Sequence, residues 1–97
     1  MATKGHMLYN KTRVATSAGV KTGAGKIWAI LLFGGSANSS LLIYDNTSAT
    51  GTDILAINTL AASTSGVTLV DLGGLDFTTG LYASIAGTGA VAYIWWG

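Results

Sequence analysis

The alternation of apolar and polar residues indicates short β-strands along most of the chain. Residues 81–86 alternate strictly, with Leu81, Ala83 and Ile85 on one side, as expected of a strand with one buried face. Turn residues (Gly, Asn, Ser and Thr) interrupt the apolar runs about every 8–12 residues, which is typical of an all-β sandwich or barrel. The pattern predicts strands near residues 8–15, 26–33, 40–45, 53–60, 67–72, 80–86 and 90–96.

Composition supports a single all-β domain. The 97 residues contain no Pro, Glu or Gln, whereas Thr, Gly, Ala and Ser are abundant and β-branched and aromatic residues fill the predicted strands. We therefore expect one antiparallel β-sandwich of about seven or eight short strands. Strand order stays open at this point, because sandwich, jelly roll and meander share one pattern.

Three predicted strands are apolar on both faces, namely residues 27–33, 41–44 and 90–96. A strand of an antiparallel sandwich has only one inner face, so the second face needs another cover. Either loops and the N-terminal segment fold over it, or copies of the protein bury it. We expect a closed symmetric homo-oligomer, a homotrimer, with an interface formed by Trp28, Phe33, Tyr93, Trp95 and Trp96.

Charge divides the chain into two parts. All five basic residues lie within the first 26 positions, and all four acidic residues lie beyond position 44. We interpret residues 1–25 as a basic N-terminal arm with a Gly-rich connector (17–25) and a possible strand at 8–15, and residues 26–97 as the sandwich body. Charged residues make up only 9% of the chain, and low charge promotes association. The basic side chains expected to contact an acidic protein surface are Lys4, Lys11, Arg13 and Lys21.

The residue pattern favours no catalytic site and no cofactor. The single histidine, His6, lies in the arm, away from any predicted packed site. Asp71 and Asp76 stand beside glycines, and Asp45 and Asp53 flank a polar loop, which are ordinary positions for turn-forming carboxylates. The loop from Asp45 to Asp53 leaves open a calcium ion or a sugar as ligand. No enzyme activity and no resident metal are expected.

Nucleic acid and membranes are not favoured as partners. The basic residues are spread singly, without interleaved aromatic stacking platforms, and the net charge is only +1. The apolar run of residues 27–33 is far shorter than the roughly 20 residues of a membrane-spanning helix. A membrane-active β-barrel would alternate polar and apolar positions, which the two-sided apolar strands do not do.

Two segments resemble small structural proteins of tailed bacteriophages. The first runs through Tyr44-Asp45-Asn46 and a Ser/Thr-rich turn to Thr50-Gly51, and the second runs through Phe77, Thr79-Gly80-Leu81-Tyr82 and Gly87-Thr88-Gly89. The resemblance covers about residues 26–96. It implies a virion β-sandwich, often jelly-roll-like, that repeats as trimers or higher rings.

The resemblance therefore implies a bacteriophage virion structural protein, located in the virion after synthesis in the host cytoplasm. The expected role is a capsid decoration or cement protein that binds the major capsid protein, or other virion proteins, and stabilises the head shell. The four basic residues of the arm would then contact the capsid. The alternative is a protein of the tail, collar or fibre with glycan-binding loops.

Overall fold

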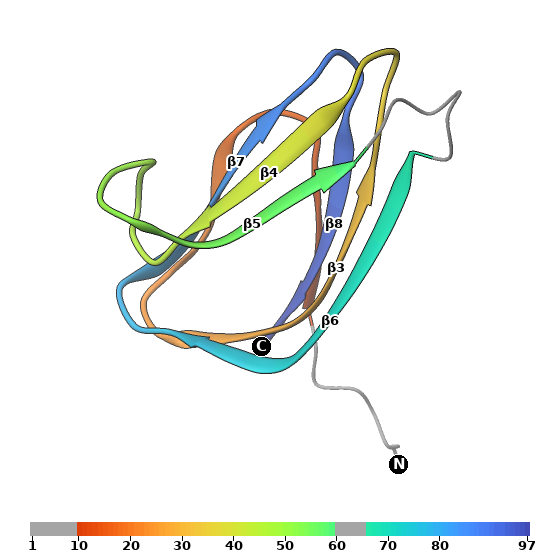
Figure 1. The fold of residues 1–97 in the computed structure, drawn as a ribbon. Helices are drawn as coiled ribbons and strands as arrows, with labels where there is room; N and C mark the ends of the chain where they lie inside the picture. Colours follow the sequence, from red (N-terminus) through yellow and green to blue (C-terminus); the bar gives the residue numbers. More distant parts are fainter. Residues whose placement is uncertain (1–9, 60–65) are drawn as a thin grey trace.

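The computed structural model describes residues 10–59 and 66–97, and within these ranges the chain is built from β-strands (Figure 1). The described ranges contain eight strands. They are β1 (Asn10–Val14), β2 (Ala18–Thr22), β3 (Gly25–Phe33), β4 (Ser39–Tyr44), β5 (Asp53–Thr59), β6 (Val67–Phe77), β7 (Gly80–Ala86) and β8 (Val91–Trp96).

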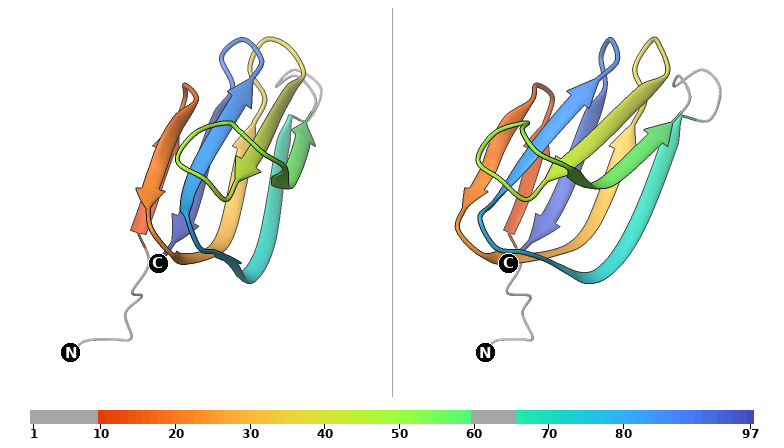
Figure 2. Two further views of the ribbon diagram at one scale, coloured as in Figure 1. Left: turned by 90° about the vertical axis from the view of Figure 1, so that its left-hand side faces the viewer. Right: turned by 60° about the vertical axis from the view of Figure 1, so that its left-hand side comes forward.

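The strands form two four-stranded antiparallel sheets that stack face to face (Figures 1 and 2). One sheet has the order β1-β8-β3-β6 and the other the order β2-β7-β4-β5. The first strand therefore pairs with the last, the second with the seventh, the third with the sixth and the fourth with the fifth. This nested pairing is that of an antiparallel ribbon rolled up on itself, the jelly roll. The predicted all-β, jelly-roll-like sandwich is confirmed.

The core lies between the two sheets, and in the described part of the chain its buried apolar side chains are aliphatic apart from the ring of Phe77. Alternation along each strand sends every second residue inward, so each sheet contributes one apolar face. The fully buried side chains of largest volume are Phe77, Ile27, Ile30, Leu32, Leu41, Ile43, Leu81 and Ile94.

The segment 17–25, predicted as a flexible connector, contains a strand. Residues 18–22 form β2, which pairs with β7, and Val20 packs against the core. The small residues of this segment conceal the strand, because only one apolar side chain marks its inner face. The register shift between Gly19 and Lys21 also breaks the alternation that would reveal it. Residues 10–22 of the basic N-terminal region thus supply an edge strand to each sheet.

Gly73 and Gly74, which follow the strand predicted at residues 67–72, lie inside the longer strand β6. Both have positive φ angles, 59° and 102°, and they accompany a register shift opposite Trp28 in β3. A β-carbon on Gly74 would lie 3.1 Å from the Trp28 ring. The two glycines therefore form a bulge that bends β6 around an indole, and the strand continues to Phe77.

Candidate interaction surface

The outward side of the sheet β1-β8-β3-β6 carries a continuous apolar surface. The register places Tyr93 of β8 beside Leu31 of β3, and Leu31 beside Leu69 of β6. In the neighbouring row on one side, Trp95 lies beside Ala29, and in the row on the other side Phe33 lies between Val91 and Val67. We call this surface the aromatic face; it consists of Ala29, Leu31, Phe33, Val67, Leu69, Val91, Tyr93 and Trp95.

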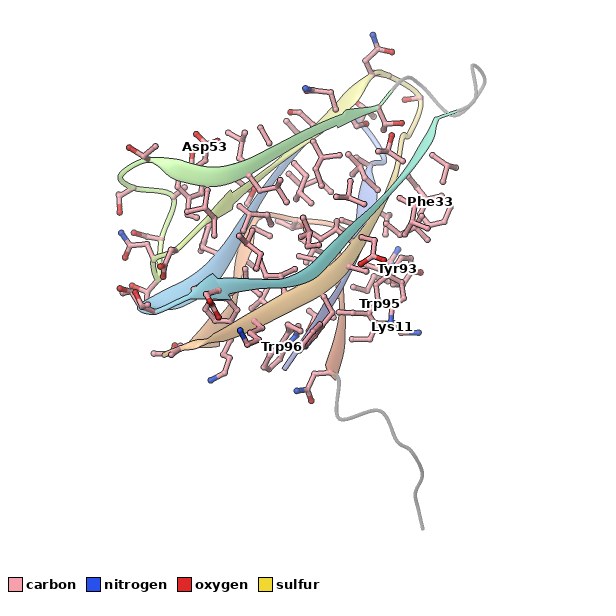
Figure 3. All side chains as sticks on the ribbon, turned by 60° about the horizontal axis from the view of Figure 1, so that its bottom comes forward. Lys11, Phe33, Asp53, Tyr93, Trp95 and Trp96 are labelled. Carbon is pink, nitrogen blue, oxygen red and sulfur yellow. The ribbon has the colours of Figure 1, made fainter. Side chains whose placement is uncertain are left out.

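Three aromatic rings form the centre of the aromatic face. Phe33 and Tyr93 meet edge to face, with ring centroids 6.0 Å apart and an interplanar angle of 85°. Trp95 continues the series, its ring centroid 6.5 Å from that of Tyr93. Figure 3 shows these three side chains on the outer side of the sheet, away from Asp53 on the opposite sheet. The rings support one another and present a pre-arranged apolar surface.

The β6 side of the aromatic face is the part most open to solvent. Leu69 is 67% exposed and Val67 54% exposed, the highest values among the large hydrophobic residues described. Apolar side chains clustered in this way usually mark a site of protein association. The sequence did not point to Leu69 and Val67, because apolar–polar alternation places the apolar residues of a strand on its buried face, whereas here both face outward.

Charged residues border the aromatic face on opposite edges. Lys11 and Arg13 lie on the outer side of edge strand β1, next to Trp95 and Tyr93 respectively. The Lys11 ammonium lies 5.7 Å from the centroid of the Tyr93 ring, a cation–π arrangement. The opposite edge strand, β6, carries Asp71 in the same row as Trp95. One edge of the aromatic face is thus basic and the other acidic.

A second acidic residue of β6, Asp76, is neutralised within the chain. Its carboxylate accepts a hydrogen bond from the Lys26 ammonium at 2.6 Å, and both groups are exposed. A surface ion pair of this kind adds little to stability. It does balance the charge at that end of the sheet, which leaves Asp71 as the acidic group beside the apolar rows.

Phe33, Tyr93 and Trp95, predicted as interface residues, share the aromatic face, whereas Trp96 points the other way. Trp96 packs against the core, and its indole Nε1 donates a hydrogen bond to Thr12 Oγ1 at 3.0 Å. In Figure 3 it lies between the sheets, apart from Trp95. Consecutive residues of a strand face opposite sides, so the two tryptophans cannot serve the same surface. Trp28 is half-buried at the bulge beside Gly74.

The basic residues predicted as one capsid-contacting arm are divided among different places. Lys11 and Arg13 belong to β1 and are part of the sandwich. Lys21 lies in β2, where its ammonium is 6.0 Å from the centroid of the Trp96 ring and donates a hydrogen bond to the Thr22 carbonyl oxygen. Lys4 and His6 lie outside the described residues. The structure therefore joins Lys11 and Arg13 to the aromatic face and separates Lys21 from it.

The Asp45 carboxylate, considered above as a calcium or sugar ligand, has a structural role. It accepts hydrogen bonds from the backbone amides of Thr79 at 2.7 Å, Thr78 at 2.9 Å and Gly80 at 3.3 Å. These amides, Thr79 first and Thr78 next, hold the pKa of Asp45 below its ordinary value. Asp45 thereby ties the end of β4 to the turn that carries the chain from β6 to β7.

The rest of the loop after Asp45 is held by side-chain hydrogen bonds of its own. Asn46 Nδ2 donates to Thr50 Oγ1 at 2.9 Å, and Asn46 Oδ1 accepts from the amide of Thr47. Within residues 10–59 and 66–97, no three His, Cys, Asp or Glu side chains are grouped so that they could hold a metal ion.

The outward side of the other sheet, β2-β7-β4-β5, is more polar. Tyr44 of β4 and Tyr82 of β7 are cross-strand neighbours there. The other outward residues in these rows are Ser40, Asn58 and Ser84 together with Leu42, Ala56 and Ala86. Ile54, which is 37% exposed, lies on β5 of this sheet. The two outer faces of the sandwich thus differ in kind: one is aromatic and aliphatic, and the other mixes polar and apolar side chains.

The fold and the aromatic face define a small jelly-roll sandwich with a surface suited to protein association. Comparison with known proteins gives no match to a family model, to a curated protein or to a solved structure. In the described part of the chain, no helix is long and apolar enough to cross a membrane.

Proposed function

We propose that this protein is a bacteriophage virion structural protein, a head decoration or cement protein that binds the capsid shell as a homo-oligomer. The observation that carries the proposal is the aromatic face. It is an apolar surface on the outside of a complete sandwich whose core is already filled by other residues. Covering such a surface with another protein lowers the free energy, because it removes apolar area from water.

The gain on covering the aromatic face is large enough to support association. Each large apolar side chain removed from water contributes about 1.5–3 kcal/mol when fully buried, and less when it starts half-buried. Leu69 and Val67 start more than half exposed, so they gain the most. Repeated over many copies on a shell, such contacts add to the stability of the assembled particle.

The virion assignment rests on the resemblance of the turn segments, and the structure gives those segments a physical link. Asp45 lies in the first segment, Thr79 and Gly80 lie in the second, and the Asp45 carboxylate bonds the amides of both residues. A carboxylate that caps a turn requires Asp at one position and a tight turn at the other. The two motifs thus act as one structural device, which supports a resemblance of fold.

Attachment to the shell is assigned to the basic residues of the N-terminal region. A deletion that tests this attachment must spare β1, because β1 pairs with β8 along its whole length. Deletion of residues 1–9, which include Lys4, removes none of the described strands. We expect this deletion to reduce occupancy on shells while the far-UV circular dichroism spectrum stays unchanged.

The test of the function is binding to purified shells that lack the protein. We expect co-sedimentation at a saturating copy number and a higher temperature of shell disruption, with the protein visible on the outer head surface by electron cryomicroscopy. Leu69→Ser should reduce binding or assembly, whereas Tyr82→Phe on the opposite sheet serves as a matched control. Absence from heads, with labelling confined to tails, would refute the decoration role.

A second candidate is a tail, collar or fibre protein that binds glycan. The favouring observation is the Tyr44–Tyr82 pair on the outer face of the other sheet, with the Ser84 hydroxyl in the adjacent row. Aromatic rings flanked by hydrogen-bonding groups suit sugar recognition. A glycan array would detect such binding, and Tyr82→Ala should abolish it. A blank array together with immunogold labelling on heads would exclude this candidate.

A further inference from the structure

The aromatic face has a charge arrangement that is complementary to itself. One cross-strand row runs Lys11, Trp95, Ala29 and Asp71, from edge strand β1 through β8 and β3 to edge strand β6. A basic residue thus begins the row and an acidic residue ends it. With neighbouring strands about 4.8 Å apart, the two charges are separated by about 14 Å. They are too far apart to pair within one chain.

We propose that the aromatic face is the interface of a twofold dimer, with the second copy of this chain as its occupant. The inference deepens the proposed function and rests on it for the biological use of the dimer. The twofold axis lies in the interface, parallel to the strands and between β8 and β3. Such an axis reverses the strand order, so that β1 of each copy covers β6 of the other and β8 covers β3.

This arrangement brings opposite charges together twice. An axis parallel to the strands keeps each row at its own level, so Lys11 of one copy faces Asp71 of the second copy, and the reverse pair forms at the other edge. A twofold axis across the strands would instead place β1 over β1, which opposes the basic edge of one copy with the basic edge of the other. Charge complementarity therefore selects one of the two symmetric ways of stacking this face.

The apolar side chains of the rows also fit the same arrangement. In the row of Lys11, the large ring of Trp95 comes to lie over the small side chain of Ala29 in the second copy. In the next row, Tyr93 comes to lie over Leu31. Stacked sheets are about 10 Å apart and cross at about −30°, so the edge residues shift by only a few Å, within reach of a lysine side chain.

The size of the surface sets the expected strength. Four strands with three rows of outward residues measure about 15 Å by 20 Å between backbone atoms, so two copies bury roughly 1,000 Å² once side chains are included. This area lies at the lower limit for a specific interface. We therefore expect a reversible dimer with a dissociation constant in the micromolar range, weakened by salt because the ion pairs lie at the rim.

Charge reversal tests the pairing directly. Sedimentation equilibrium of the full chain should show a dimer, and K11D or D71K alone should raise the dissociation constant about tenfold, because each places like charges together twice. The double variant K11D/D71K should return it to within about threefold of the original value. The matched control K11D/D53K has the same net charge but changes Asp53 on the opposite sheet, and it should not rescue.

A mixing experiment locates the contact even if a charge variant folds poorly. The chain has no cysteine, so a spin label attached to K11C has a single site. When the spin-labelled variant is mixed with the isotope-labelled original protein, it should broaden the amide signal of Asp71 in the isotope-labelled copy. Broadening at β5 instead of β6, a monomer at all concentrations, a trimer, or failure of the double variant to rescue would each overturn the inference.

The dimer and the shell-binding function can fail separately. A dimer that does not bind shells leaves the inference standing and removes the decoration role. A monomer that binds shells through the aromatic face overturns the inference and leaves the decoration role standing.

Discussion

The Asp45 carboxylate accepts a hydrogen bond of 2.7 Å from the amide of Thr79, joining residues that are 34 positions apart in the chain. Asp45 follows β4 of one sheet, and Thr79 lies in the turn that links β6 of the other sheet to β7. A single side chain therefore fixes the crossing of the chain between the two sheets at this end of the sandwich.

Stability should depend on pH through Asp45. Its folded-state pKa is lowered, so the unfolded chain takes up a proton more readily as the pH falls. The stabilisation is fully present above the unfolded pKa of about 3.9 and is lost as the pH falls through the lower, folded pKa. Urea unfolding between pH 2 and 7 should show this loss in the native protein and a smaller one in Asp45→Asn. Identical pH profiles of the two proteins would contradict the role of Asp45.

Leu31 and Leu32 are neighbours in β3 with different roles. Leu32 is fully buried between the sheets, so Leu32→Ala should lower the free energy of unfolding by about 3 kcal/mol. Leu31 lies on the aromatic face, so Leu31→Ala should cost less than about 1 kcal/mol while weakening self-association. Urea denaturation and sedimentation equilibrium measure the two effects. Equal losses of stability would show that the outer face is covered within the chain.

The hydrogen bond from Trp96 to Thr12 should hold edge strand β1 to the sandwich. Thr12→Val removes the acceptor of the indole Nε1 hydrogen and should cost about 1 kcal/mol, whereas Thr12→Ser keeps the acceptor and should cost less. Chemical denaturation followed by tryptophan fluorescence gives both values. Equal effects of the two substitutions would mean that the Thr12 hydroxyl does not contribute.

The bulge in β6 should tolerate a side chain at one glycine and not at the other. Gly73→Ala meets open space and incurs only the cost of a positive φ angle, about 1 kcal/mol. Gly74→Ala combines a φ of 102° with a β-carbon 3.1 Å from the Trp28 ring, so it should cost about 2–3 kcal/mol. Thermal unfolding compares the variants, and a smaller loss for Gly74→Ala would contradict this account of the bulge.

The strands with clear signals were predictable from the sequence, and two features were not. Residues 80–86 alternate regularly and form β7 as expected. Residues 18–22 show one apolar side chain in a run of small ones, so β2 has no detectable period. Gly73 and Gly74 looked like a turn because glycine at positive φ serves turns and bulges alike.

The candidate site was predictable in part. The excess of apolar residues on β3 and β8 indicated a surface in need of a cover, and Phe33, Tyr93 and Trp95 do lie on it. Trp96 was included because its chemistry matches that of Trp95, yet it packs inward. When both faces of a strand are apolar, composition does not tell which one is inside.

The amino-acid sequence by itself determined the all-β class, most strand positions and the separation of basic from acidic residues, because these depend on local periodicity and composition. Only the tertiary structure decided that the first strand pairs with the last, and that Lys11 and Asp71 end the same row. Both depend on contacts between residues far apart in the chain, and strand pairing through backbone hydrogen bonds leaves little trace in side-chain identity. The order of the strands in the sheet places the basic residue Lys11 and the acidic residue Asp71 on opposite edges of the aromatic face.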